Sequence, residues 1–152
     1  KLIADKEDTE QVFHIFESLP SKGFFDRARD FVQSENGKSL IKSENYLPVL
    51  LDDHDRLRKF PLNSVAHAYV DFMERVGLSA AGLVAEYEKF RDPSKRFDDL
   101  IEWYGNRLRD THDLLHILTG YGRDALGEQC VLAFTYSQNG NFGNFFIAYA
   151  GG

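Results

Sequence analysis

The sequence has little of the material that disulfide-rich domains and membrane-spanning proteins are built from. It holds one cysteine, Cys130, in 152 residues, which excludes an intramolecular disulfide and a zinc site built from several cysteines. This cysteine usage favours a reducing compartment. No run of about 18 apolar residues occurs, so no transmembrane helix is predicted. The opening KLIADKEDTEQ is too acidic for a signal or transit peptide.

Positive charge is also scarce. The chain has 18 Lys and Arg against 24 Asp and Glu, a formal charge of -6, and phosphate binding needs clustered cations. We therefore expect no nucleic-acid partner. Aromatic residues are abundant instead, with 13 Phe, 7 Tyr and 1 Trp. This supply exceeds the obvious needs of a small core and is typical of proteins with apolar ligands or partners.

Helical periodicity covers nearly the whole chain, and no Val- and Ile-rich alternating segment predicts a strand. Helices are predicted over 10–19, 22–33 with Gly37 as the stop, 64–76, 79–90, from Ser94 with an apolar stripe continuing towards Leu115, 124–136 and 142–149. The region 41–61, with Pro48 and Pro61, predicts a turn or short helix. We therefore expect an all-α fold, a single-domain helical bundle over residues 1–152, either complete or trimmed at one or both ends.

The most distinctive stretch is HDLLHILTGYGRDALGE, residues 112–128. His112 and His116 lie four residues apart, and Asp113 lies three before His116, so a helix places the three side chains within an arc of about 100°. Two glycines then allow a tight turn, and Asp124 can cap the next helix. In an antiparallel helical hairpin, Glu128 would face His116.

Two imidazoles and a carboxylate converging from two packed helices predict a divalent-metal site with positions open to water or substrate. The alternative is that the histidine pair arises by chance and that Asp113 pairs with Arg109 on the helix surface. The spacing also resembles the HExxH helix of zinc peptidases, but Asp113 stands where the general base Glu would be. A peptidase is therefore disfavoured.

The pattern HDxxH, eleven residues, then E resembles the signature of the coenzyme Q biosynthesis protein 4 family. The resemblance extends upstream to Trp103, Arg107, Arg109 and Asp110, and to the stretch PLNSVAHAYVDFM, where His67 replaces an expected Gly. It covers roughly residues 10 to 150. It implies that His112, Asp113, His116 and Glu128 bind a divalent metal, usually assigned as zinc, with Fe2+ and Mg2+ as alternatives.

The resemblance also implies a role in ubiquinone biosynthesis on polyprenylated hydroxybenzoate intermediates. The implied activity is that of a metal-dependent decarboxylase, a lyase, which removes the C1 carboxylate of the ring and, in the oxidative version, installs a hydroxyl there. Asp113 and His116 are the candidate catalytic residues, Asp113 either as a ligand or as a proton donor. Zinc has no redox chemistry, whereas two His and one carboxylate also suit Fe(II) oxygenases. Plain decarboxylation needs only a Lewis acid.

A polyprenyl substrate with an anionic head group would need apolar and cationic side chains to bind it, which the aromatic residues and the arginines could supply. Phe134, Phe142, Phe145, Phe146 and Tyr149 are the candidate lipid-tail residues, with core packing as the alternative. Arg107 and Arg109 are the candidates for binding an anionic head group. For each arginine the alternative is a salt bridge with Glu102 or Asp113.

Two further hypotheses remain beside the decarboxylase. One is a non-catalytic lipid-binding scaffold that organises the other ubiquinone-biosynthesis proteins, and the other is a small metallohydrolase unrelated to quinones. An isoprenoid lipid substrate implies peripheral attachment to a membrane surface. We expect the cytoplasmic face of the inner membrane in a bacterium, which the missing transit peptide favours, or the matrix face of the inner mitochondrial membrane in a eukaryote. A homo-oligomer is left open.

Overall fold

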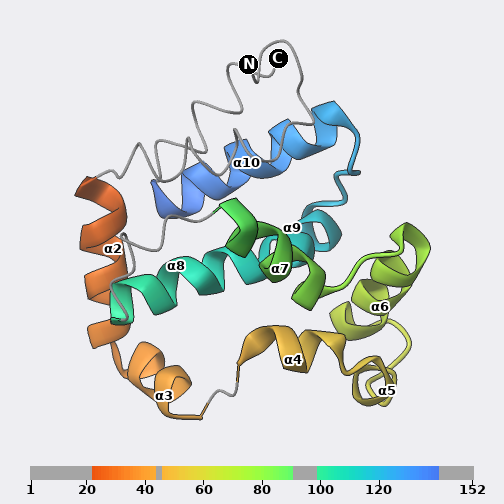
Figure 1. The fold of residues 1–152 in the computed structure, drawn as a ribbon, viewed down its shortest axis with the longest axis horizontal. Coiled ribbons are helices and arrows are strands. Elements are labelled where there is room, and N and C mark those ends of the chain that lie inside the picture. Colours follow the sequence, from red (N-terminus) through yellow and green to blue (C-terminus); the bar gives the residue numbers. More distant parts are fainter. Residues whose placement is uncertain (1–21, 44–45, 91–98, 141–152) are drawn as a thin grey trace.

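Helices make up all the regular structure of residues 22–43, 46–90 and 99–140, the parts of the chain that a computed structural model describes (Figure 1). These residues contain no strand, which confirms the predicted all-α fold class. No helix among them is long and apolar enough to cross a membrane. The helices are α2 (Lys22–Gln33), α3 (Glu35–Ser43), α4 (Leu47–Asp52), α5 (His54–Leu57), α6 (Val65–Val76), α7 (Ala80–Phe90), α8 (Leu100–Asp110), α9 (His112–Thr119) and α10 (Ala125–Asn139).

Helix α6 forms the centre of the core. It begins as predicted at Ser64, whose hydroxyl accepts a hydrogen bond from the amide of His67 at 3.3 Å, and it ends at Gly77 in the left-handed conformation, with φ of 69°. A serine cap at the start of a helix and a left-handed glycine at its end are both common. One face of α6 is buried against its neighbours, and the main cluster comprises Leu51, Tyr69, Val70, Phe72, Met73 and Ala80.

Helix α9 packs on this cluster through Leu114 and Ile117. Helix α8 comes before it in the chain and contacts α2 through a group of aromatic rings, in which Phe31 stacks on Trp103 with centroids 6.3 Å apart. Phe31 also lies 5.4 Å from the ring of Tyr104. In Figure 1, α8 runs from left to right across the middle and α10 returns above it in the opposite direction. These contacts hold α9 between α6 and α10.

Three predicted boundaries are wrong. Gly37 does not stop α2: the chain turns at Ser34, whose hydroxyl accepts from the Gly37 amide at 3.0 Å, and Gly37 lies inside α3. A Cβ at Gly37 would collide with the Phe31 carbonyl, so this glycine serves close packing. Helix α10 also continues beyond the predicted end at Tyr136, to Asn139.

The predicted helix from Ser94 towards Leu115 is interrupted at Thr111, and its first described helical residue is Leu100. Asp99 is extended and caps α8 by accepting from the amides of Ile101 and Glu102, both at 2.9 Å. At Thr111 the helix ends, because the threonine hydroxyl bonds back to the backbone carbonyls of Arg107 and Leu108 and competes with helical continuation. The helix with the two histidines is therefore a separate element. The segments 10–19 and 142–149 and the predicted start at Ser94 lie outside the described residues.

The acidic run 52–55 has a structural use that its sequence did not reveal. The two carboxylate oxygens of Asp52 accept hydrogen bonds from the amides of Ala80 at 2.7 Å and Ala81 at 2.9 Å, so Asp52 caps the distant helix α7. Asp53 accepts from the amide of Arg56 and caps α5. The predicted irregular region 41–61 thus holds short helices whose acidic residues satisfy helix amides.

We predict that Asp52→Ala lowers the free energy of unfolding by about 1 to 2 kcal/mol, since two amides at the start of α7 lose their charged acceptor. Asp55→Ala, an exposed residue in the same run, should change it by less than about 0.5 kcal/mol. Urea unfolding followed by circular dichroism measures both. Equal effects of the two substitutions would show that the contact between Asp52 and α7 contributes nothing.

Candidate metal centre

The two histidines lie on one face of α9, next to the face that packs on the core. Residues four apart on a helix differ by about 40° around the axis, so His112 and His116 share one face, while Leu114 and Ile117 lie on the face that packs on the core. Asp113 falls between the two faces and is 7 % exposed. Packing of Leu114 and Ile117 against α6 therefore fixes the direction of the histidines.

The turn between α9 and α10 brings Glu128 to the histidines. Gly120 adopts φ of 75°, and its amide donates to the carbonyl of His116 at 2.9 Å. Asp124 caps α10 through the Gly127 amide at 3.1 Å, as predicted. At Gly127 the helix backbone touches the carbonyl of Gly122, and a Cβ there would collide with it. This close approach seats the turn directly on the first turn of α10, which contains Glu128.

Three ligand atoms meet at the predicted positions. The Nε2 atom of His112 lies 3.2 Å from Oε2 of Glu128 and 3.2 Å from Nε2 of His116, and the latter is 3.4 Å from the same oxygen. Metal–ligand bonds of about 2.0–2.1 Å at tetrahedral angles separate neighbouring ligand atoms by roughly 3.3 Å. The spacing of these three atoms therefore fits a single ion of that kind.

The orientation of His116 is set by its surroundings. Its Nδ1 lies 3.1 Å from the carbonyl oxygen of Tyr121, and its ring stacks on Phe72 with centroids 5.9 Å apart and an interplanar angle of 18°. A carbonyl can only accept, so this contact requires a proton on Nδ1 and leaves the Nε2 lone pair for the centre in the neutral ring. Metal-binding histidines in proteins are commonly held in this way.

Asp113 supplies a second indication of a bound cation. Its carboxylate oxygen lies within 4.8 Å of ligand nitrogens of His112 and His116. Among the described residues, the hydroxyl of Tyr69 is buried without a hydrogen-bond partner. A buried carboxylate is costly unless it is paired, and an ion between the histidines would offset that cost. The residues present thus fit a divalent metal.

The charges of the site shift the pKa values of its members. Burial alone would raise the pKa of Glu128, but hydrogen bonds and charge from His112 and His116 outweigh it and hold the value well below the usual 4.5. For His116, burial would lower the pKa, and the hydrogen bond and charge of Glu128 reverse this, so the pKa lies above 6.5. Without a metal the site is therefore held by a histidine–glutamate ion pair.

The structure places the predicted arginines away from this cluster. Arg109 forms an ion pair with Asp110 at 2.7 Å, and its guanidinium lies 4.9 Å from the ring centre of Tyr87. Asp110 is an ion-pair partner that the sequence prediction did not name. Arg107 lies over Trp103 and borders a cavity of about 340 Å3 between α3, α4 and α8. Head-group binding by the two arginines stays a prediction.

Only one of the predicted lipid-tail residues belongs to the described chain. Phe134 lies on α10 and is 37 % exposed, so it is not a fully buried core residue. The other four, Phe142, Phe145, Phe146 and Tyr149, lie outside the described residues.

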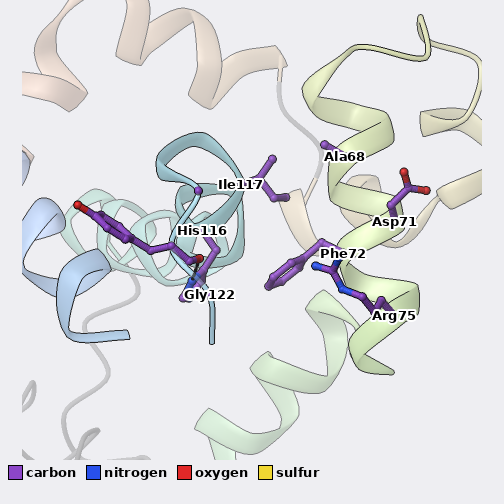
Figure 2. A pocket seen from close by; sticks show the side chains of 9 residues that line it. Ala68, Asp71, Phe72, Arg75, His116, Ile117 and Gly122 are labelled. Atoms are coloured by element: carbon purple, nitrogen blue, oxygen red, sulfur yellow. Dashed lines mark hydrogen bonds between the residues drawn. The ribbon is translucent and has the colours of Figure 1, made fainter. Parts of the chain in front are cut away.

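Two features of the site have no local signal in the sequence. The first is the carbonyl of Tyr121, a backbone group that any residue would supply. The second is a cavity of about 370 Å3 that reaches His116 from the side of α6 and is lined also by Phe72, Arg75 and the turn at Gly120–Gly122 (Figure 2). The cavity arises because α6 and the turn meet, although more than 40 residues separate them in the chain.

Comparison with known proteins assigns the family. The sequence profile of the coenzyme Q (ubiquinone) biosynthesis protein Coq4 matches residues 24–142, which include all four predicted ligands. The chain belongs to this family. The resemblance noted in the sequence is thereby confirmed, and with it a place in ubiquinone biosynthesis.

Individual relatives carry the same description. The chain is 28 % identical over 98 residues to the ubiquinone biosynthesis protein COQ4 homolog, mitochondrial, of Aedes aegypti, covering 64 % of this chain and 33 % of the relative. It is 27 % identical over 123 residues to the mitochondrial COQ4 protein of Podospora anserina, covering 80 % and 38 %. The chain thus spans about a third to two fifths of these relatives. No solved structure matches.

We predict that Gly127→Ala weakens the metal centre without touching a ligand. The new methyl group would push the turn off α10 and displace Glu128, costing about 1 to 3 kcal/mol of stability and lowering zinc affinity about tenfold. Zinc competition against a chromophoric chelator measures the second effect. Gly105→Ala inside α8 is the matched control, since its Cβ would meet only Phe24 at 3.6 Å. Unchanged zinc affinity in Gly127→Ala would contradict the prediction.

A second prediction concerns pH in the chelator-treated chain. The lowered pKa of Glu128 contributes stability above pH 4.5 that is lost on acidification, and the raised pKa of His116 contributes stability below pH 6.5 that is lost as pH rises. The difference in unfolding free energy between wild type and Glu128→Gln should therefore be largest between these values. Zinc affinity should instead increase with pH, because the histidines must release protons. Urea titrations with and without zinc test both trends.

Proposed function

We propose that the chain binds a divalent metal and acts on polyprenylated hydroxybenzoate intermediates of ubiquinone biosynthesis, with decarboxylation at ring C1 as the core step. Membership of the family supports the pathway. The observation that supports metal chemistry is the convergence of His112, His116 and Glu128 at separations of 3.2 to 3.4 Å beside the buried carboxylate of Asp113.

His112, His116 and Glu128 would hold the ion, with Asp113 either as a fourth ligand or as a neighbour. Two imidazole nitrogens favour zinc or Fe2+ over Mg2+, which prefers oxygen ligands. When bound, the metal would supply a Lewis acid for the ring carboxylate. Zinc is our first choice, and the oxidative version of the reaction would need molecular oxygen as oxidant and a redox-active metal such as iron.

Decarboxylation breaks the bond between C1 and the carboxylate, releases carbon dioxide and leaves the electron pair on the ring carbon. A proton must then reach C1. Asp113 is our candidate donor, because its carboxyl group is buried beside the histidines, where bulk water does not compete. His116, held by Tyr121 and Phe72, orients the site.

A non-catalytic lipid-binding scaffold is the second candidate. It is supported by exposed apolar side chains at and beside the turn between α9 and α10. Leu118 is 63 % exposed, Tyr121 45 % and Leu126 68 %. Such side chains could contact an isoprenoid tail, a membrane surface or the other ubiquinone-biosynthesis proteins. The relatives' names indicate mitochondria, and we propose peripheral attachment at the matrix face of the inner membrane in a eukaryotic host. A bacterial location stays a prediction.

Metal content and carbon dioxide release separate the two candidates. We expect about one zinc or iron per chain, by mass spectrometry, after purification of the wild type without chelator or affinity nickel. His116→Ala and Glu128→Gln should lose the metal, whereas His54→Gln, an imidazole outside the site, should keep it. Release of labelled carbon dioxide from a carboxyl-labelled prenylated 4-hydroxybenzoate should follow metal content.

A wild type that is metal-free and cannot be loaded would overturn the metal-dependent enzyme. If His116→Ala and Glu128→Gln lost the metal but bound the prenylated acid as tightly as wild type, and no variant released carbon dioxide, the scaffold would take its place.

A further inference from the structure

The lining of the cavity beside His116 contains one guanidinium, that of Arg75. Arg75 extends from α6 into the same space as Phe72, with its guanidinium carbon 5.7 Å from the centre of the Phe72 ring, and it forms no ion pair with any described residue (Figure 2). The other charged residue of the lining, Asp71, is neutralised by Arg58 at 2.6 Å. Arg58 also pairs with Glu74 at 2.9 Å, and Arg75 is the guanidinium that the lining itself offers to an anionic ligand.

The rest of the lining is apolar or aromatic. Ala68, Phe72 and Ile117 contribute hydrocarbon surface, and the turn at Gly120–Gly122 contributes backbone with Tyr121. The volume of about 370 Å3 lies within the range of roughly 300–1,000 Å3 that is usual for small-molecule sites. An apolar space with a single guanidinium suits a ligand with a planar hydrophobic body and one anionic group, because the guanidinium fork pairs with a carboxylate through two parallel hydrogen bonds.

We propose that this cavity binds an aromatic carboxylic acid, with Arg75 paired to the carboxylate and Phe72 against the ring. The cavity meets the metal centre only at His116, which is the residue of the lining that belongs to both. Arg75 is thus a residue that selects and positions the ligand. Identification of this acid with the head group of the substrate rests on the proposed function, whereas the binding itself does not.

The test is an NMR titration of the full chain with 4-hydroxybenzoate, with phenol and inorganic phosphate as comparison ligands. The amide signals of Ile117, Gly120 and Gly122 should shift with 4-hydroxybenzoate, and those of Gly77 and Gly105, outside the lining, should not. Arg75→Gln should weaken binding about tenfold, the usual loss for a charge-assisted hydrogen bond. Arg75→Lys should give an intermediate value, because the charge stays and the fork is lost.

Arg56→Gln is the matched control, since it removes an exposed guanidinium of α5 outside the cavity. Equal affinity of wild type and Arg75→Gln for 4-hydroxybenzoate would overturn the proposal, as would shifts confined to other parts of the chain. Phosphate binding as tight as that of 4-hydroxybenzoate, and equally dependent on Arg75, would overturn the aromatic class of the ligand. Tight binding of phenol would show that the carboxylate is not recognised.

Metal content is measured on the same samples, so the two proposals fail separately. Arg75-dependent binding of 4-hydroxybenzoate to a protein that holds no metal would support the cavity and contradict the metal-dependent reaction. A metal-loaded wild type whose cavity amides do not respond to the acid would contradict the cavity alone.

Discussion

Everything in the site depends on the position of α9, a helix of eight residues that is too short to be stable by itself. Its apolar side is held by α6, through Leu114 and Ile117, and its end is held by the turn that rests on α10 at Gly127. Between these two contacts the helix has no freedom to rotate. The direction of the histidines is thus set by the packing of α9 on the core, including the stacking of His116 on Phe72, and the core and the site are two consequences of one arrangement.

The electrostatics of the site follow from the same arrangement. Packing of α9 buries His116 and Asp113 beside the half-buried Glu128, and each of these groups would prefer water to an apolar environment. The His116–Glu128 pair offsets part of this cost. Arg123 lies 3.5 Å from the other carboxylate oxygen of Glu128 and adds positive charge at the edge of the site. Under the proposed function, a divalent cation bound here would add its binding free energy to the stability of the fold.

The features that could be predicted from the sequence are those governed by local chemistry. The four-residue spacing of His112 and His116, the caps at Ser64 and Asp124 and the glycine-rich turn each depend on neighbours within a few residues, and together they placed Glu128 opposite the histidines. The break at Thr111 was not predicted, because the apolar stripe of the sequence continues through this position. The only local signal against a continuous helix was one hydroxyl group that can bind backbone carbonyls. The Asp52 cap on α7 and the cavity lined by Arg75 could not be predicted, since both join segments more than 25 residues apart.

The short sequence separation of His112 and Glu128 has a consequence for how the protein folds. These two residues lie 16 positions apart, whereas Arg27 on α2 lies 111 positions from Gln138 on α10, whose carbonyl it contacts. Closing a short loop costs less chain entropy than closing a long one and occurs sooner. The hairpin of α9 and α10 can therefore form before the N-terminal helices have packed against the rest of the chain. If the chain binds a metal as proposed, an ion bound to this hairpin early in folding would stabilise it before the remaining helices pack.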